Sequence, residues 1–419
     1  MNPVSIMSVS KTMKLLKQRR IKMKKKLALL LAVIMVISIS FTGCGGGDDG
    51  GGAEGDTIKV GWIGALTGPL APWGTCESQA LQMYVDQQNE EGGVLGKKLE
   101  LVKYDTKGDN QESVNAVKRL IGNDKVCAIL GPNASAAAIA IKGALNDGKV
   151  PDISTVGTNP EITVDKKGNV NEYNFRVCFT DPYQGAVAAG YAADELGAKK
   201  AAILYDVASD YSQGFMEFFI DTFEAKGGEI VAQEAFKADD TDFRPQLTKI
   251  KGTNPDVILM PYFYKEVAMS ANQARDLGIE ATFLGGDGWP SDTLFEMAGP
   301  AIEGSYVVNH FDYNDPTVKP VTDAYIAKYD KSPEINAYMV HDAFKLLIAA
   351  IEKAGSADPE AITEALTEVE VDGVTGTIRL GKETHNPEGK EAAIQQIVKS
   401  DTAKDGFEYK FIQKYTPDK

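Results

Sequence analysis

The chain has 419 residues, of which 43% are hydrophobic and 25% charged, and its formal net charge is −15. This is the composition of a globular protein that is longer than one hydrophobic core usually covers, so two lobes are expected. An acidic chain lacks the clustered positive charge that nucleic acids and anionic membrane surfaces attract, which argues against both as partners.

The first part of the chain carries an export signal. Residues 23–44 begin with basic residues and continue with the 15-residue apolar run Leu27–Phe41. This run is shorter than the roughly 20 residues that a membrane-spanning helix needs, and a Gly-rich tail follows it where a basic flank would stop transfer. The pattern predicts a cleaved signal peptide. A translation start at Met23 is an alternative, because residues 1–22 add only charge.

The signal ends in Phe41-Thr42-Gly43-Cys44, which resembles a lipobox, a motif whose Cys thiol receives a diacylglycerol. We expect residues 1–43 to be the leader and residues 44–56 to be a lipidated Cys44 with a Gly-rich tether; an uncleaved anchor is the alternative. The leader holds nine basic and no acidic residues, which leaves 35 basic against 59 acidic residues and a formal net charge of −24 for the exported part.

Cysteine and histidine spacing gives no sign of a metal site. Beyond Cys44 the cysteines are Cys76, Cys127 and Cys178, an odd number at wide spacing, so they need not pair. The three histidines are likewise isolated in sequence. We therefore predict no metal and no cofactor, and the state of the three cysteines stays open.

From Thr57 onward, short β-rich runs alternate with helical patterns. The first set predicts strands at 58–64, 99–104 and 126–130 and helices at 78–89, 111–121 and 135–146. The second set predicts strands at 174–179, 201–205, 230–232 and 257–260 and helices at 183–195, 212–226 and 243–251. Such alternation implies parallel sheets covered on both faces. Two sets of similar size indicate two lobes of like architecture, with a ligand cleft between them.

The pattern changes from about Gly304. It predicts a strand at 305–309, helices at 317–329, 336–354 and 362–368, and β-rich runs to Tyr415. These elements either complete the two lobes or form a third small domain, and periodicity does not decide between the two.

Enzyme and nucleotide motifs fail on spacing. Gly92–Lys98 looks like a phosphate loop, but it is one residue short, and Lys98 stands where Ser or Thr would hold magnesium, so a helix stop and turn is the better interpretation. Gly61-Trp62-Ile63-Gly64 lacks the spacing of a dinucleotide loop. No nucleophile elbow or catalytic histidine constellation is recognisable, and we predict that the protein is not an enzyme.

Many short pieces of the sequence match one family in the same order. They are Ile58-Lys59-Val60-Gly61, Leu66-Thr67-Gly68-Pro69, Trp73-Gly74, Lys103-Tyr104-Asp105, Ile129-Leu130-Gly131-Pro132, Arg176, Asp181-Pro182-Tyr183-Gln184-Gly185, Tyr211 to Gly214, Gln273-Ala274-Arg275 and Leu284-Gly285-Gly286-Asp287-Gly288. From about Thr57 the chain resembles the extracellular amino-acid-binding proteins of ABC importers, most closely the leucine/isoleucine/valine-binding protein family.

That resemblance implies an α/β fold of two doubly wound parallel-sheet lobes, joined by three crossings of the chain and closing like a hinge over a ligand. It favours completion of the lobes over a third domain. The crossings are expected near residues 179–181, 310–313 and 387–391. Lobe one would comprise residues 57–179 and 312–389, and lobe two would comprise residues 180–311 and 390–419.

The resemblance also implies how an amino acid would be held. Ser135 opens a helix, so its hydroxyl and nearby N–H groups would bind the ligand carboxylate, together with Thr158. Val156 would offer its backbone carbonyl to the ammonium, and Asp287 would supply the opposite charge. Taken alone, Ser135 could be a helix N-cap and Asp287 a turn residue.

Three aromatic residues would surround the ligand. Trp73 would line the side-chain pocket, Tyr211 would cover the ligand from lobe two, and Phe263 replaces what is often a Tyr, which favours an apolar ligand side chain. The chain lacks the two cysteines that form a bridge near the cleft in well-known relatives; Gly108 and Ala134 lie close to those positions.

We therefore expect a lipid-anchored protein at the extracellular face of the membrane, or in the periplasm, that captures an amino acid and delivers it to an ABC permease. A branched-chain or other apolar amino acid is favoured, although the sequence does not identify which one. The alternatives are a binder of another small solute, such as an aromatic acid, an amide or a urea-like molecule, and a ligand sensor.

Overall fold

The structure, a computed structural model, describes residues 57–238 and 240–417. The predicted leader, Cys44 and the Gly-rich tether lie outside the described residues. Within the described part of the chain, no helix is both long enough and apolar enough to cross a membrane.

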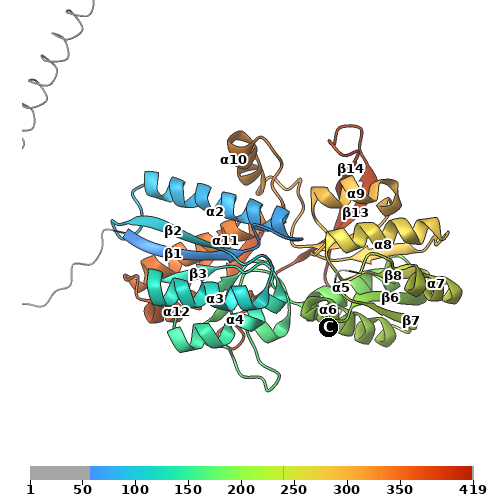
Figure 1. Cartoon of the computed structure of the whole chain (residues 1–419), viewed down its shortest axis with the longest axis horizontal. Helices are drawn as coiled ribbons and strands as arrows, with labels where there is room; N and C mark the ends of the chain where they lie inside the picture. The colour runs from blue at the N-terminus through green and yellow to red at the C-terminus, as the bar shows by residue number, and fades with distance from the viewer. Residues whose placement is uncertain (1–56, 239, 418–419) are drawn as a thin grey trace, which may run out of the picture. The chain divides into compact units, whose positions relative to one another are not determined.

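The first of two main sheets is entirely parallel and has the order β2-β1-β3-β4-β5 (Figure 1). Its strands are β1 (Thr57–Gly64), β2 (Lys98–Asp105), β3 (Ala128–Leu130), β4 (Asp152–Ser154) and β5 (Asn174–Arg176). The helices of this lobe are α2 (Ala71–Glu90), α3 (Asn110–Arg119), α4 (Ser135–Gly148), α10 (Lys319–Tyr329), α11 (Ile335–Ala354) and α12 (Pro359–Leu366). Figure 1 shows α2 on one side of the sheet and α3 and α4 on the other, which explains why β1 is almost wholly buried.

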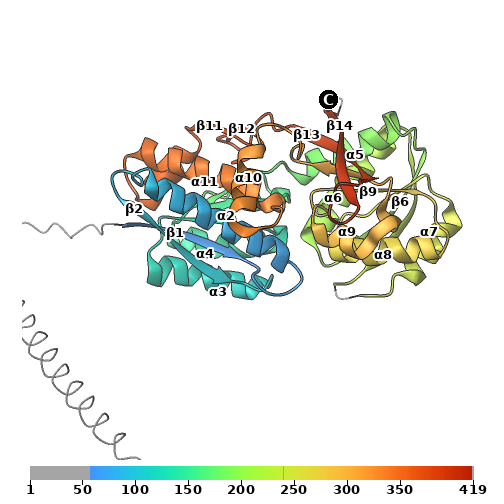
Figure 2. The ribbon, with the colours of Figure 1, turned by 90° about the horizontal axis from the view of Figure 1, so that it is seen from above.

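The second sheet has the order β14-β13-β10-β9-β8-β6-β7. Its strands are β6 (Lys200–Asp206), β7 (Glu229–Phe236), β8 (Val257–Leu259), β9 (Thr282–Gly285), β10 (Tyr306–Asn309), β13 (Ala392–Lys399) and β14 (Phe407–Tyr415). Its helices are α5 (Asp181–Asp194), α6 (Asp210–Ala225), α7 (Arg244–Thr253), α8 (Tyr264–Asp276) and α9 (Asp292–Ala298). The expectation of a parallel sheet holds for five strands, whereas β13 and β14 extend it in antiparallel pairing (Figure 2).

The elements after Gly304 complete both lobes and form no separate domain. Helices α10 and α11 pack against α2, where Tyr325 donates a hydrogen bond from its hydroxyl to Gln79 Oε1 (2.7 Å). The small hairpin of β11 (Glu370–Gly373) and β12 (Gly376–Arg379) precedes the return of the chain to the second sheet. The chain thus passes three times between the two lobes, as the resemblance implies; the residues of each crossing stay a prediction.

Both lobes share one topology. In each, the first strand lies between the second and the third, so β1 and β3 in one lobe correspond to β6 and β8 in the other. In an open α/β sheet of this order, ligands bind beyond the carboxyl ends of the strands at the point where the strand order reverses. The topology therefore directs attention to the loops that follow β1, β3 and β4, and to those that follow β6, β8 and β9.

A buried arginine fastens the loop that follows β4. The Arg176 guanidinium donates hydrogen bonds to the carbonyl oxygens of Gly157 (2.9 Å) and Asn159 (2.7 Å) and to Thr163 Oγ1 (3.1 Å). Its side chain is fully buried. Because a planar guanidinium offers several donors in fixed directions, it can hold this loop at more than one point.

A buried glutamate supports the same loop from α2. Thr155 Oγ1 donates a hydrogen bond to Glu77 Oε1 (2.5 Å), and Oε2 has no partner among the described residues. The side-chain nitrogens of Asn133 and Trp62 also face this carboxyl. Burial raises the pKa of Glu77 to about 8, and the hydrogen bond from Thr155 acts to lower this pKa. Glu77 is therefore mainly protonated at neutral pH.

Replacement of Glu77 by Gln should change how stability depends on pH. A carboxyl whose pKa is higher in the folded state binds a proton on folding, so its contribution is full below about pH 4.5 and is lost as pH rises through about 8. Gln does not titrate. Between pH 5 and 9, urea denaturation should show that the unmodified protein loses a few kcal/mol of unfolding free energy relative to Glu77→Gln.

The matched control is Glu90→Gln, which changes an exposed glutamate of the same helix. Its stability should follow that of the unmodified protein at every pH. Parallel curves for Glu77→Gln would contradict the assignment of a protonated, buried Glu77.

Candidate functional site

The loops at the carboxyl ends of the strands carry the predicted site residues. From the first lobe, Ser135 follows β3 and Val156 and Thr158 follow β4. From the second lobe, Tyr211 follows β6 and Asp287 follows β9. Trp73, in α2 after β1, and Phe263, after β8, complete the set. This is the arrangement that the shared topology of the lobes predicts.

Six of these seven residues meet around one small cavity. It is lined by Trp73, Ala134, Ser135, Val156, Tyr211, Phe263, Asp287 and Gly288. Its free volume is about 10 Å³, which is the space of a single water molecule. An amino acid therefore fits only after the lobes or the lining side chains have moved apart.

Direct hydrogen bonds join the lobes around this cavity. Trp73 Nε1 donates to the carbonyl of Pro290 (3.0 Å), and Asn159 Nδ2 donates to the carbonyl of Asp210 (2.8 Å). The Tyr264 hydroxyl donates to the Pro69 carbonyl (2.9 Å). A wider groove of about 400 Å³ shares Ala134 and Phe263 with the cavity. The structure is thus a closed form, with a groove that adjoins the cavity.

Three aromatic rings form one wall. Phe263 packs edge-on against Trp73, with ring centroids 5.6 Å apart and an interplanar angle of 87°. Its other side stacks on Tyr211, with centroids 5.5 Å apart. The Gly288 N–H donates a hydrogen bond to the Tyr211 hydroxyl (3.2 Å). The wall is therefore built mainly of aromatic ring faces, and the Tyr211 hydroxyl faces the Asp287 carboxyl.

Ser135 opens α4 and is not its N-cap. The N-cap is Ala134, which has no side-chain capping bond, so the first N–H groups of the helix lack an intrahelical partner. The Ser135 hydroxyl is buried and accepts a hydrogen bond from the Asn159 N–H (3.2 Å). Since a helix N-terminus carries a partial positive charge, this side of the cavity suits an anion.

Thr158 does not line the cavity. Its side chain is fully buried, and Oγ1 has no hydrogen-bond partner among the described residues. The hydroxyl faces the carboxyl of Asp181, whose N–H donates to the Thr158 carbonyl (2.9 Å). Burial raises the pKa of Asp181 well above its usual range. A contact from Thr158 to a ligand carboxylate stays a prediction, and in this closed form it would require rotation of the side chain.

Asp287, which belongs to the second lobe, contributes a buried carboxylate to the cavity. Its side chain is 3% exposed, Oδ2 lies 3.1 Å from His310 Nε2, and Oδ1 has no hydrogen-bond partner among the described residues. The Asp287 N–H donates to Gln184 Oε1 (2.9 Å). A Cβ on Gly286 would lie 2.2 Å from Gln184 Oε1, so only glycine allows this close approach.

The sequence patterns did not assign roles to four supporting residues: Glu77, Arg176, Gln184 and His310. Arg176 and Gln184 stand inside pieces that carry the family resemblance, but a piece of sequence does not show which group it contacts. In the sequence, His310 is one of three isolated histidines and stands at an expected crossing of the chain, which assigns it no contact. Its relation to Asp287 follows from β9 and β10 being parallel neighbours, because residues just after two such strands lie side by side.

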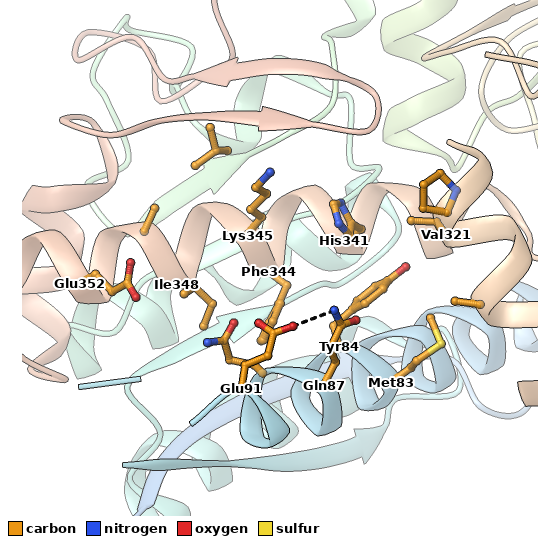
Figure 3. Close-up of a pocket in the computed structure, with 15 residues that line it drawn as sticks. Met83, Tyr84, Gln87, Glu91, Val321, His341, Phe344, Lys345, Ile348 and Glu352 are labelled. Atoms are coloured by element: carbon orange, nitrogen blue, oxygen red, sulfur yellow. Dashed lines mark hydrogen bonds between the residues drawn. The ribbon is translucent and has the colours of Figure 1, made fainter. Parts of the chain in front are cut away.

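A larger cavity elsewhere lacks the convergence of polar groups from both lobes that marks this site. It has a volume of about 520 Å³ and lies between α2 and α11 on the first lobe (Figure 3). Its polar groups belong to partly exposed helix surfaces; Gln87 Nε2 of α2, for example, donates to Oε1 of Glu91, the C-cap residue of that helix (3.0 Å). They do not converge from two lobes on one point, so this groove is not the candidate site.

The cysteines are not arranged as metal ligands in the part of the chain that the structure describes. Cys76, Cys127 and Cys178 are all buried and free. Within the described residues, no three His, Cys, Asp or Glu side chains gather as they would around a metal ion. Gly108 and Ala134, which stand near the family's cysteine positions, both line the groove of about 400 Å³.

Comparison with known proteins identifies the family. The profile of the periplasmic binding protein family matches residues 57–403. The chain is 33% identical over 336 residues to the Leu/Ile/Val-binding protein BraC3 of Rhizobium johnstonii, a match that covers 79% of this chain and 88% of that protein.

Solved structures give the same result. The branched-chain amino acid transporter substrate-binding protein LivJ of Streptococcus pneumoniae, solved in complex with isoleucine, has a TM-score of 0.77 and 32% identity, covering 85% of this chain and 99% of that one. A solute-binding protein of an ABC transporter from Rhodopseudomonas palustris, in complex with 3,4-dihydroxybenzoic acid, has a TM-score of 0.77 and 25% identity, covering 87% and 99%. The chain belongs to the periplasmic binding protein family and has the two-lobe type I fold of its substrate-binding proteins of ABC transporters.

Proposed function

We propose that this chain captures an amino acid with an apolar side chain and delivers it to an ABC permease. The observation that carries the proposal is the pair of opposite walls around the cavity. One wall is the N-terminus of α4 with Ser135, and the other is the Asp287 carboxylate, whose Oδ1 has no hydrogen-bond partner among the described residues. A zwitterion presents the two complementary charges.

Desolvation explains why both walls are needed. A carboxylate and an ammonium lose their hydration when they are buried, so each must gain charge-assisted hydrogen bonds from the protein. Asp287 can accept from the ammonium through Oδ1. The helix N-terminus can donate to the carboxylate. The rings of Trp73 and Phe263 leave no charged partner for the ligand side chain, which supports an apolar one.

The relatives support this choice of ligand, since BraC3 is named for Leu, Ile and Val, and LivJ was solved with isoleucine. The relative with 3,4-dihydroxybenzoic acid favours an aromatic acid as a second candidate. An aromatic acid carries no ammonium, however. Its carboxylate would have to share a buried cavity with the Asp287 carboxylate, which is a like charge. Asp287 is therefore the residue that separates the two candidates.

Capture needs no catalysis. Closure of two lobes over a solute is a hinge motion, and the hydrogen bonds between the lobes are available only in the closed form. Presentation to a permease outside the cell agrees with the export signal. We propose that a diacylglycerol on Cys44 tethers the protein there, and that residues 45–56 act as a flexible spacer.

A thermal-shift screen tests the ligand class. The full chain is heated with each of the twenty amino acids, with 3,4-dihydroxybenzoate and with benzoate, because a ligand that binds only the folded state raises the melting temperature. Apolar amino acids should raise it, and Asp287→Asn should abolish the rise. Asp276→Asn, a change at an exposed aspartate of α8, is the control. A rise with aromatic acids alone would contradict the proposal.

Lipidation is tested at Cys44. Growth with a labelled fatty acid should label the unmodified protein in the membrane fraction, whereas Cys44→Ser should carry no label and leave that fraction or stay unprocessed. Cys127→Ala, at a buried cysteine, should be labelled normally. Label on Cys44→Ser would refute the anchor.

A further inference from the structure

The His310 imidazole contacts one oxygen of the Asp287 carboxylate. Its Nε2 lies 3.1 Å from Asp287 Oδ2, while Oδ1 of the same carboxylate is the oxygen without a partner among the described residues. The His310 side chain is fully buried. The two residues follow β10 and β9, which are paired in parallel, so the sheet itself fixes their separation.

Among the described residues, the His310 imidazole has a hydrogen-bond partner at Nε2 alone. Its ring lies against Phe179, with centroids 3.7 Å apart and an interplanar angle of 31°. Its backbone N–H donates to Asn309 Oδ1 (2.7 Å). Nδ1 has no hydrogen-bond partner among the described residues. The ring therefore satisfies most polar groups when the proton is on Nε2 and is donated to Asp287.

Two charged groups face the imidazole. Burial lowers the pKa of His310 below its usual range, the Asp287 carboxylate acts in the opposite direction, and the Lys390 ammonium lowers the pKa further. Lys390 is itself buried, and burial lowers its pKa to about 8. Between pH 5 and 7 Lys390 therefore keeps its proton, so that a change of charge at His310 can be separated from one at Lys390.

Resting on the proposed function, we propose that His310 is a positioning residue for the ligand ammonium. Neutral His310 donates from Nε2 to Asp287 Oδ2 and leaves Oδ1 for the ammonium. Protonated His310 places a second cation on the same carboxylate. Proton and amino acid then compete for one buried charge. Because linkage is reciprocal, an ammonium that opposes protonation of His310 is itself bound less tightly when His310 is protonated.

The first test is the pH profile of L-leucine binding, measured by calorimetry on the full chain from pH 5 to 7. The dissociation constant of the unmodified protein should rise as the pH is lowered toward 5, because protonation of His310 competes with the ammonium. His310→Gln keeps a donor that does not titrate, so its affinity at pH 7 should stay within about fivefold and its acid-side weakening should vanish. His310→Leu keeps the bulk without a donor and should bind about 10- to 100-fold more weakly at pH 7.

His385→Gln is the matched control, because His385 is also buried, stacks on Phe175 and contacts the Asn174 carbonyl, away from the cavity. It should reproduce the profile of the unmodified protein. An acid-side weakening that survives in His310→Gln, or full affinity in His310→Leu, would overturn the proposal.

A second measurement separates this inference from the proposed function. Nitrogen chemical shifts of the imidazole rings, recorded without amino acid, should show His310 as the Nε2–H form at pH 7, and Asp287→Asn should shift its titration. If His310 is unaffected by Asp287→Asn, the inference is overturned whether or not L-leucine binds. If His310 responds but no amino acid binds, the pairing stands and its role toward an ammonium is overturned together with the proposed function.

Discussion

The Asp287 carboxylate is the constraint around which the second-lobe side of the site is organised. A carboxylate that is 3% exposed has lost most of its hydration, and this loss costs free energy unless hydrogen bonds or an opposite charge replace the water. His310 contacts one oxygen, and the Tyr211 hydroxyl also faces this carboxyl. Under the proposed function, a ligand ammonium would supply the partner that Oδ1 lacks among the described residues, which would favour an ammonium over neutral or anionic solutes.

The topology of the two sheets explains why this carboxylate lies at the same cavity as groups from the other lobe. Both lobes bring the carboxyl ends of their strands to the same cavity, so loops that are more than 100 residues apart in sequence line it together. The first lobe contributes a helix N-terminus, held in place by Arg176 and Glu77 through the neighbouring loop. The second lobe contributes charge and aromatic rings. Neither lobe alone carries both groups, so the proposed capture of a zwitterion would require the two lobes to close on it together.

Sequence patterns predict the regular elements well where periodicity is strong. The expected strand at 58–64 and helix at 135–146 agree with β1 and α4. The expected helix at 78–89 begins too late, because α2 starts at Ala71 with Pro72 and Gly74, residues that usually indicate a loop. Pro fits the first turn of a helix, and a Cβ on Gly74 would lie 2.0 Å from the Ala65 carbonyl oxygen, so a glycine is needed there. Strand β4, Asp152-Ile153-Ser154, has no apolar pattern to reveal it.

The functional site, like the regular elements, could be predicted from the sequence only in part. The family resemblance implies seven site residues, and the fold brings all of them except Thr158 around one cavity. It gave no contact for His310 or Glu77, since a hydrogen bond between buried side chains depends on which strands are neighbours and on which loops pack together. Glu77 and Thr155 are 78 positions apart, and no local pattern links them. Pocket size was likewise inaccessible from sequence, because it depends on how far the lobes have closed.

The central claim is that Asp287 recognises an ammonium. It is tested most directly by calorimetric titration of the full chain with the amino acid that gives the largest thermal shift and with the same molecule lacking its amino group, for example L-leucine and 4-methylpentanoate. Loss of the ammonium leaves a buried carboxylate unpaired, so the deaminated acid should bind at least about 100-fold more weakly. Equal binding of the two would show that Asp287 does not select the ligand and would contradict the account.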